Sequence, residues 1–356
     1  MSHEAASPPF RLLSLAPELQ LHILSWLEYD APSILSVRLV NRQISTISEG
    51  FFAKTFLWSL TVNPFTDDLY RLHRVADHEH FRHHVGALEI QPFRHPDDPL
   101  PKRLRKKVIP GWAKVANGFE VDHTSPTAQD FLHCLSRLPN CVSFSIRDID
   151  EWGRVVEDDE IPRLAPPTDC LALLIRAAAA PAQPVRIRSL RVIMSGIPED
   201  GCVRPQHLPI ELVRSGAFRQ NLATNLRTLH LSPFFRHPLS SWEDGSHSED
   251  SYFKAFMLIV SAAENLESLV LGGFHERTGR LVRELANMST FPSRLRHFVL
   301  TGGVYHDPED KRVSTSDLIK VLKRAGAGGV YATARWPDTR LCNPLRQKGA
   351  RCPPTG

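Results

Sequence analysis

The stretch Asn225-Leu226-Arg227-Thr228-Leu229-His230-Leu231 alternates apolar and polar side chains, and Asn265-Leu266-Glu267-Ser268-Leu269-Val270-Leu271 repeats its pattern. Both follow the order apolar-x-x-apolar-x-apolar. Such alternation is typical of a half-buried β-strand, because successive side chains of a strand point to opposite faces of the sheet. We therefore predict one strand in each stretch, with its last two leucines on the buried face.

The same pattern occurs six times along the chain, and a stretch with helical character precedes each copy. The strand segments are Val85/Leu88/Ile90, Cys141/Phe144/Ile146, Ile187/Leu190/Val192, Leu226/Leu229/Leu231, Leu266/Leu269/Leu271 and Leu295/Phe298/Leu300. The preceding stretches are 67–84, 126–138, 169–180, 208–223, 252–264 and 279–288. Helices that alternate with strands predict an α/β fold with a parallel sheet.

This succession of strand, loop and helix resembles the leucine-rich repeat, most closely in its last three copies. The central residues Leu88 and Phe144 are 56 residues apart, whereas Leu269 and Phe298 are 29 apart. Regular leucine-rich repeats span ~20 to 29 residues, so the early copies must carry insertions. The resemblance implies an irregular solenoid of strand-loop-helix units. A general α/β domain with parallel strands and crossover helices is the alternative.

Residues 15–60 differ from the rest and show a run of short helical patterns. Pro17 suits the first turn of a helix, where its missing N–H costs nothing, and Glu18 suits the positive end of the helix dipole. A second helix start lies at Pro32, and we expect a third helix over 44–60. About 45 residues of short helices can bury only part of this apolar surface, so we expect some of it to be left for a partner.

The order of residues in this module resembles the F-box, whose pattern begins Leu-x-x-Leu-Pro-x-Glu-Leu and ends Leu-Val-(Cys/Asn)-Arg. The matching residues are Leu12, Leu15, Pro17, Glu18, Leu19, Ile23, Leu24, Leu27, Leu39, Val40, Asn41 and Arg42. The resemblance implies a three-helix module that binds a SKP-family adaptor and, through it, a cullin. The residues expected to divide between the module's core and this contact are Leu15, Pro17, Glu18, Leu19, Ile23, Leu27, Ile34, Leu35 and Leu39. An ordinary helical cap on a larger domain is the alternative.

Together, the two resemblances imply an architecture frequent in fungal proteins: the non-catalytic substrate-recognition subunit of an SCF-type cullin-RING ubiquitin ligase. Its repeat region would bind a protein substrate on the concave side. The strand residues expected there are Thr228, His230, Ser232, Ser268, Val270, Gly272, His297, Val299 and Thr301. A phosphorylated substrate would require arginines on that face, where the sequence offers Arg147 and Arg191. The second hypothesis is a leucine-rich-repeat scaffold, without a role in ubiquitination, whose N-terminal helices cap the solenoid.

We expect four segments in the 356-residue chain. They are a disordered N-terminus (1–10), the F-box module (11–60), the repeat domain (61–334) and an irregular or disordered basic tail (335–356). The net charge of +4 equals the excess of five Lys/Arg over one Asp in that tail. The rest of the chain is therefore balanced, and we expect neither nucleic acid nor membrane as a partner, in a cytoplasmic or nuclear protein.

Loops are expected at 91–117, 157–160 and 240–251. The basic run 101–108 lies in the first of them and could act as a nuclear import signal or as a solvated loop. We expect the Gly-rich stretch 326–329 to end a helix over 316–325, which is the wrong end of the helix dipole for a phosphate.

The sequence offers little chemistry for catalysis, and we expect no cofactor or metal. The densest set of possible ligands is His73, Asp77, His78, Glu79, His80, His83 and His84. If this segment is helical throughout, His80 and His84 share a face and could bind zinc, but a solvated helix face is the simpler interpretation. Asp148-Ile149-Asp150 is similar to the Asp-x-Asp of sugar transferases, but three residues are too few to indicate that activity, and a polar loop after a strand is the preferred interpretation. The six cysteines are scattered, which favours free thiols.

Overall fold

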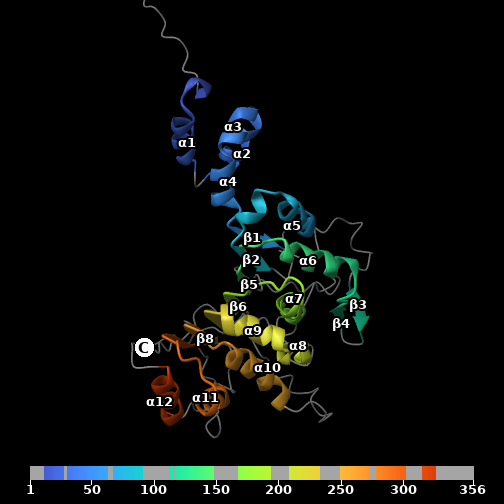
Figure 1. The fold of residues 1–356 in the computed structure, drawn as a ribbon, viewed down its shortest axis with the longest axis vertical. Coiled ribbons are helices and arrows are strands. Elements are labelled where there is room, and N and C mark those ends of the chain that lie inside the picture. Colours follow the sequence, from blue (N-terminus) through green and yellow to red (C-terminus); the bar gives the residue numbers. More distant parts are fainter. Residues whose placement is uncertain are drawn as a thin grey trace, which may run out of the picture.

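A computed structural model of the protein describes residues 12–27, 30–62, 67–90, 112–115, 118–147, 167–193, 208–232, 249–272, 278–301 and 315–325. This part of the chain is an α/β structure (Figure 1). A group of short helices lies at one end. The remainder is an array in which strands line the inner side and helices the outer side.

Seven parallel strands form the main sheet, in the order β1-β2-β5-β6-β7-β8-β9. They are β1 (Ser59–Val62), β2 (Ala87–Ile90), β5 (Ser143–Arg147), β6 (Ser189–Ile193), β7 (Thr228–Ser232), β8 (Ser268–Gly272) and β9 (His297–Thr301). The predicted central residues are direct partners across the sheet: Leu88, Phe144, Leu190, Leu229, Leu269 and Phe298. Each is at most 2% exposed. The six predicted strands and their buried faces are therefore confirmed.

The helices that precede these strands occupy the predicted stretches, with two differences: the helix of 67–84 ends at Asp77, and 208–223 holds two helices. They are α5 (Asp67–Asp77), α6 (Pro126–Ser136), α7 (Pro167–Ala179), α8 (Ile210–Arg214), α9 (Gly216–Asn225), α10 (Glu249–Ala262) and α11 (Thr278–Asn287). Their apolar faces join the buried side of the sheet in one continuous core, with large side chains such as Phe131, Phe218 and Phe256 at its centre.

The link between neighbouring strands is the same throughout the array. One carbonyl oxygen at the start of each strand accepts two backbone N–H groups from the start of the next; these carbonyls belong to Trp58, Gly86, Val142, Arg188, Arg227 and Glu267. The side chains of Asn140 and Asn265 add bonds of 2.7 Å to the preceding repeat, at the carbonyls of His83 and Ala223. Because Trp58 provides the first of the six carbonyls, the regular array begins at this residue.

The single helix predicted over 44–60 is divided into two helices and ends at Phe56, so the prediction is wrong only for its last residues. Instead, α3 (Arg42–Ile47) is followed by α4 (Glu49–Phe56) and by β1, a strand that we did not predict. Leu57, Leu60 and Val62 repeat the apolar-x-x-apolar-x-apolar pattern, and Leu60 is the partner of Leu88 on β2. Pairing with β2 gives the backbone N–H and C=O groups of this segment their hydrogen-bond partners. The segment is therefore a strand, although a helical pattern precedes it.

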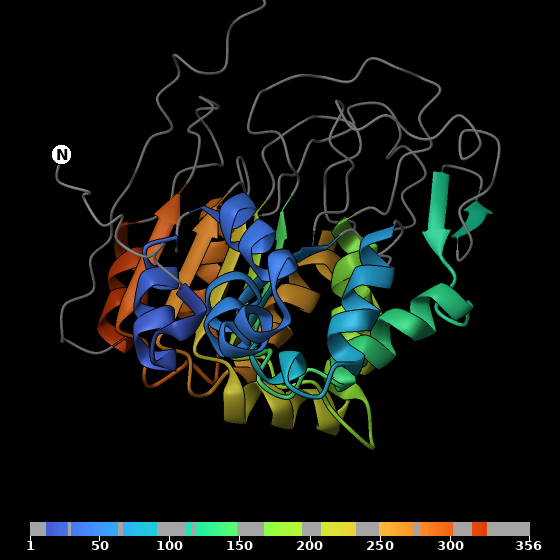
Figure 2. The ribbon, with the colours of Figure 1, turned by 90° about the horizontal axis from the view of Figure 1, so that it is seen from above.

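Two predicted loops contain regular structure. Residues 112–115, placed in the first loop, form β3 (Trp112–Val115), which pairs antiparallel with β4 (Gly118–Val121). This hairpin lies on the outer side of the helix layer, away from the main sheet (Figure 2). The loop predicted to reach residue 251 ends earlier, because α10 begins at Glu249.

Several predictions fall on segments outside the described residues. These are the N-terminus 1–10, the basic run 101–108, the acidic residues 148–150 and 157–160, the Gly-rich stretch 326–329 and the tail 335–356.

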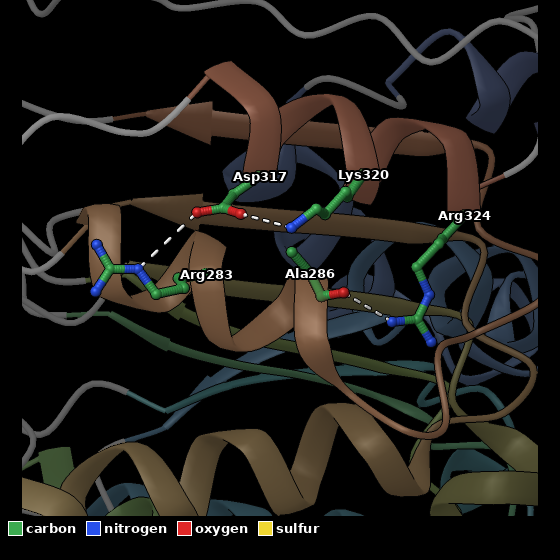
Figure 3. Close-up of polar contacts among 5 residues, drawn as sticks. All are labelled: Arg283, Ala286, Asp317, Lys320 and Arg324. Carbon is green, nitrogen blue, oxygen red and sulfur yellow. Dashed lines mark hydrogen bonds and ion pairs between the residues drawn. The ribbon is translucent and has the colours of Figure 1, made fainter.

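The last described helix, α12 (Thr315–Arg324), packs on α11 and agrees with the helix predicted over 316–325. Asp317 lies between Arg283 (Nε to Oδ2, 3.9 Å) and Lys320 (Nζ to Oδ1, 3.3 Å) (Figure 3). Arg324 donates a hydrogen bond of 3.0 Å to the carbonyl of Ala286 in the last turn of α11. This bond satisfies a carbonyl that lacks a hydrogen-bond partner within α11. Helix α12 thus covers α11, the last of the helices that precede a strand.

Candidate protein-binding surfaces

The N-terminal helices begin and end where the sequence supplies caps. They are η1 (Leu12–Ser14), α1 (Pro17–Ser25), α2 (Ala31–Val40), α3 and α4. Pro17 occupies the first position of α1, as predicted. Asp30 accepts the Ser33 N–H at the start of α2 (3.1 Å), and Asn41 accepts the Gln43 N–H at the start of α3 (2.7 Å). Such caps satisfy N–H groups that lack a partner within the helix, so the breaks between these helices are fixed locally.

The helical module has a small core of its own. Its buried apolar residues are Leu24, Ile34, Ile44, Ala53 and Leu57. Arg38 connects α2 to α4, since its guanidinium lies 4.3 Å from the ring centroid of Phe52 and donates to the Ser48 hydroxyl (3.4 Å). The continuous core of the array begins at Val62 and contains none of these residues. The module and the array therefore each have a core of their own.

Both α1 and α2 turn an apolar stripe towards solvent. On α1 and at its C-cap, Leu19, Ile23 and Trp26 are 52%, 40% and 79% exposed. On α2, Leu35 and Leu39 are 46% and 88% exposed. We call the following seven residues the open apolar surface: Leu13, Leu19, Ile23, Trp26, Leu35, Leu39 and Val40. They account for seven of the ten large apolar side chains that are exposed in the described residues, so exposure is concentrated on this module.

The structure divides the nine predicted adaptor-binding residues into three groups. Six are exposed: Pro17, Glu18, Leu19, Ile23, Leu35 and Leu39. Leu15 and Leu27 are half-buried, whereas Ile34 is fully buried and belongs to the module's core. The sequence reasoning missed Leu13, Trp26 and Val40, which are exposed beside the predicted ones. Helical spacing could have placed Trp26 with Leu19 and Ile23, since the three lie on one face of α1.

The junction between module and array is closely packed. The Trp58 ring lies over Gly86, and a Cβ atom on that glycine would stand 2.3 Å from the ring. Only a residue without a side chain allows this approach. Phe52 of α4 also contacts Phe81 (ring centroids 6.2 Å apart), on which His78 stacks at 3.9 Å. These contacts hold α4 against the first repeat.

The histidine-rich segment does not form the helical metal site considered above. Because α5 ends at Asp77, His80 and His84 do not lie one helical turn apart. His73 contacts Asp77 (Nδ1 to Oδ2, 2.7 Å), and Arg137 pairs with the same carboxylate. Within the described residues, no group of three His, Cys, Asp or Glu side chains is placed to hold a metal ion.

The six predicted substrate-facing residues lie on the side of the sheet opposite the helices, which we call the open face. Thr228, Ser268 and His297 form one row across β7, β8 and β9; His230, Val270 and Val299 form the next. All but His297, which is exposed, are half-buried. The three further residues predicted here, Ser232, Gly272 and Thr301, lie in the strands, but their exposure falls outside the description.

The two arginines of the open face differ in whether a negatively charged side chain lies beside them. Arg147 pairs with Glu89 on β2 (Nη1 to Oε2, 3.4 Å). Arg191, at the centre of β6, has Ser145 and His230 as its partners across the sheet. Neither neighbour carries a negative charge, so the guanidinium of Arg191 stands without a counter-ion on the sheet.

Burial lowers the pKa of His230 from 6.5 to about 4, and the cationic Arg191 acts in the same direction. The unfolded chain takes up this proton near its ordinary pKa, whereas the folded chain does so only near pH 4. Between pH 6.5 and about pH 4, the chain therefore takes up a proton at His230 when it unfolds. As the pH falls through this range, the free energy of unfolding decreases.

We expect a His230→Asn variant to lose less stability on acidification than the wild type. The measurement is the urea midpoint at about pH 7.5 and about pH 5, compared between the two proteins, so that other titrating groups cancel. Equal losses would contradict the assignment. Imidazole NMR signals that disappear in the variant identify His230, which should remain neutral at the lower pH.

The described cysteines are not arranged for nucleophilic chemistry. Cys134, Cys141 and Cys170 are free and buried. Burial raises the pKa of Cys134 and of Cys141 to about 12. These thiols are protonated at neutral pH, and their role in the structure is packing.

No family model matches the sequence, and no curated protein shows significant similarity to it. Among the described helices, none combines the length and apolar character needed to cross a membrane. The open apolar surface and the open face of the sheet therefore provide the basis for inferring function.

Proposed function

We propose that this protein is a substrate-recognition subunit of an SCF-type cullin-RING ubiquitin ligase. The N-terminal module is then an F-box that binds a SKP-family adaptor, and the array is an irregular leucine-rich-repeat-like solenoid that binds a protein substrate. Such a subunit contributes no catalytic residue of its own. It acts by holding the substrate near the transfer machinery, which raises the local concentration of the reacting groups.

The observation that carries the proposal is the open apolar surface on a module with its own core. An apolar surface of this kind is characteristic of a protein interface, because contact with water is unfavourable for it. Leu19, Ile23 and Leu39 belong to the F-box pattern, and all three are at least 40% exposed. An N-terminal cap of the solenoid would turn these residues inward, so their exposure favours adaptor binding over the scaffold hypothesis.

The repeat array supports the second half of the proposal. Its strands present a row of small polar side chains, such as Thr228 and Ser268, on a face that no described helix covers. A broad face of this kind suits recognition of a polypeptide. On this proposal the protein works in the cytoplasm or the nucleus, where cullin-based ligases act.

The proposal is tested by co-expressing the full chain with a fungal SKP-family adaptor. The wild type should co-purify with the adaptor, and the triple variant Pro17→Ala, Leu19→Ala, Ile23→Ala should lose at least about tenfold in affinity. Tyr70→Ala is the matched control, because Tyr70 is 67% exposed but lies on α5, outside the module. Failure of the wild type to co-purify would falsify adaptor recruitment and leave the scaffold hypothesis, and equal co-purification of the triple variant would show that these residues do not form the adaptor contact. Mass spectrometry of proteins captured with the wild type should show cullin and substrate together.

A further inference from the structure

Strand β9 is the last strand of the described sheet, and one of its edges is free within the described residues. Strand β8 pairs with it on one side, and no described strand lies on the other. The last apolar residue of β9, Leu300, is half-buried. The residues at the same position of the five strands before it are at most 1% exposed: Ile90, Ile146, Val192, Leu231 and Leu271. The described residues therefore leave the core partly uncovered at this end of the array.

The backbone of β9 also lacks the link that joins the other strands to their successors. In that link, the carbonyl of the residue before a strand accepts two N–H groups from the start of the next strand, as those of Arg227 and Glu267 do. Arg296 holds this position before β9, and no described N–H group bonds to its carbonyl. An edge with unpaired backbone groups is a template for another strand, so native proteins usually cover it.

Helix α12 resembles the helices that precede a strand, but no strand follows it within the described part of the chain. It packs on α11, and both Val321 and the adjoining Ala325 belong to the continuous core. The other helices that directly precede a strand of the main sheet are α5, α6, α7, α9, α10 and α11. Helix α12 therefore has the position of the helix of one further unit.

The sequence after α12 has the pattern of the strands. Residues 326–333 are Gly-Ala-Gly-Gly-Val-Tyr-Ala-Thr, in which Ala327, Val330 and Ala332 repeat the order apolar-x-x-apolar-x-apolar. Valine, tyrosine and threonine favour strands, and glycine suits the turn that ends a helix. The segment that follows the helix therefore has the sequence of the missing strand.

The linker to such a strand would have a length that occurs elsewhere in the array. Residues 226–227 join α9 to β7, and residues 263–267 join α10 to β8. A strand that starts at residue 329 leaves 325–328 as its linker, which is intermediate between these two. A segment tethered so closely has a high effective concentration at the free edge, so it is favoured there over a second copy or a strand of another protein.

We propose that residues 329–333, which lie outside the described residues, pair in parallel with β9 as the last strand of the sheet. Val330 is then the partner of Phe298 on the core side, and Tyr331 lies beside Val299 on the open face. The open face thereby extends by one strand and gains an aromatic side chain for contact with a partner. The inference is independent of the proposed function, because it depends on the array alone.

Amide hydrogen exchange of the full-length chain, measured by mass spectrometry, tests the pairing. Residues 329–333 of the wild type should exchange at least about tenfold more slowly than an unstructured peptide of the same sequence. Val330→Asp places a charge on the core side, so it should remove this protection and speed up exchange in 297–301. Tyr331→Asp is the matched control, because it places the same charge one residue later on the open face, where protection should remain.

Disulfide formation tests the register. The double variant Val299→Cys, Tyr331→Cys should form a disulfide under mild oxidation, because partners on adjacent strands lie within its Cα–Cα reach of about 7 Å. The control is Val270→Cys, Tyr331→Cys. Val270 is the partner of Val299 on β8, one strand further from the proposed strand, and strands are spaced by about 4.8 Å. This pair should therefore stay reduced.

Each other outcome contradicts the proposal. Fast exchange of 329–333 in the wild type, or equal effects of the two aspartates, excludes a strand at this position. Protection without the disulfide between positions 299 and 331 places the strand elsewhere, or on a second copy if sedimentation shows a dimer. Val330→Asp should leave adaptor capture unchanged, and the F-box triple variant should leave the exchange of 329–333 unchanged, so the two proposals fail separately.

Discussion

Replacement of Leu39 by aspartate is expected to abolish adaptor capture and to leave the fold intact. Leu39 is 88% exposed on α2, so the new carboxylate is solvated in the free protein and costs little stability. In the complex, the same carboxylate would lose its water against an apolar partner surface without a compensating charge. Burial of an unpaired charge is costly, and we expect affinity to fall by at least about 3 kcal/mol, or more than a hundredfold.

The matched variant is Ile34→Ala, five residues earlier on the same helix. Ile34 is fully buried in the module's core. Removal of such a side chain costs roughly 2 to 5 kcal/mol, which is close to the whole stability of a module of this size. We therefore expect Ile34→Ala to lose adaptor binding because the module unfolds, and Leu39→Asp to lose it with the module folded. Circular dichroism and urea denaturation separate the two. Strong adaptor capture by Leu39→Asp would show that α2 does not contact the adaptor.

The contrast between Leu39 and Ile34 also shows what the sequence could not supply. Both are apolar residues at helical spacing, and both were predicted to belong to the adaptor contact or the core. Apolar residues around most of a helix allow the helix to be predicted from the sequence. They do not show which face of the helix is covered by the rest of its own chain. That assignment depends on how α1, α2 and α3 cross, which only the three-dimensional packing provides.

The strands were predicted more completely, because the signal there is repeated. Six copies of one pattern predicted six strands, and the sheet register aligns their central residues from Leu88 to Phe298. The copy formed by Leu57, Leu60 and Val62 was overlooked. It follows a stretch with helical spacing almost directly, so it was taken as the end of that helix. The hairpin of β3 and β4 belongs to an insertion, which the repeat pattern could not predict.

The surroundings of Arg191 show a further limit of the sequence. The sequence placed Arg191 on the open face, but it did not show which residues lie beside Arg191 on the neighbouring strands. Ser145 lies 46 residues before it and His230 lies 39 residues after it in the chain, and the parallel register brings both to its sides. The absence of a counter-ion is a property of this three-strand neighbourhood. No local motif could have revealed it.

A Phe144→Ala variant is expected to destabilise the array strongly without impairing adaptor capture. Phe144 is fully buried between Leu88 and Leu190, its partners on the adjacent strands. Loss of a buried phenylalanine costs roughly 3 to 5 kcal/mol, because the cavity cannot close between two strands held in register. The measurement is the free energy of unfolding from urea denaturation. Ser143→Ala, on the open face of the same strand, is the control and should change it by less than about 0.5 kcal/mol.

The position of Phe144 makes this variant informative about how the two parts of the chain depend on each other. In a repeat array each unit is stabilised mainly by its neighbours, so a cavity in β5 weakens the packing on both sides of it. The helical module has its own core and touches the array only near the first repeat. The variant should therefore still capture the adaptor while its array unfolds at a lower urea concentration. If adaptor capture disappears together with the array, the module depends on the array for its fold, and the separation of cores described above is not functional independence.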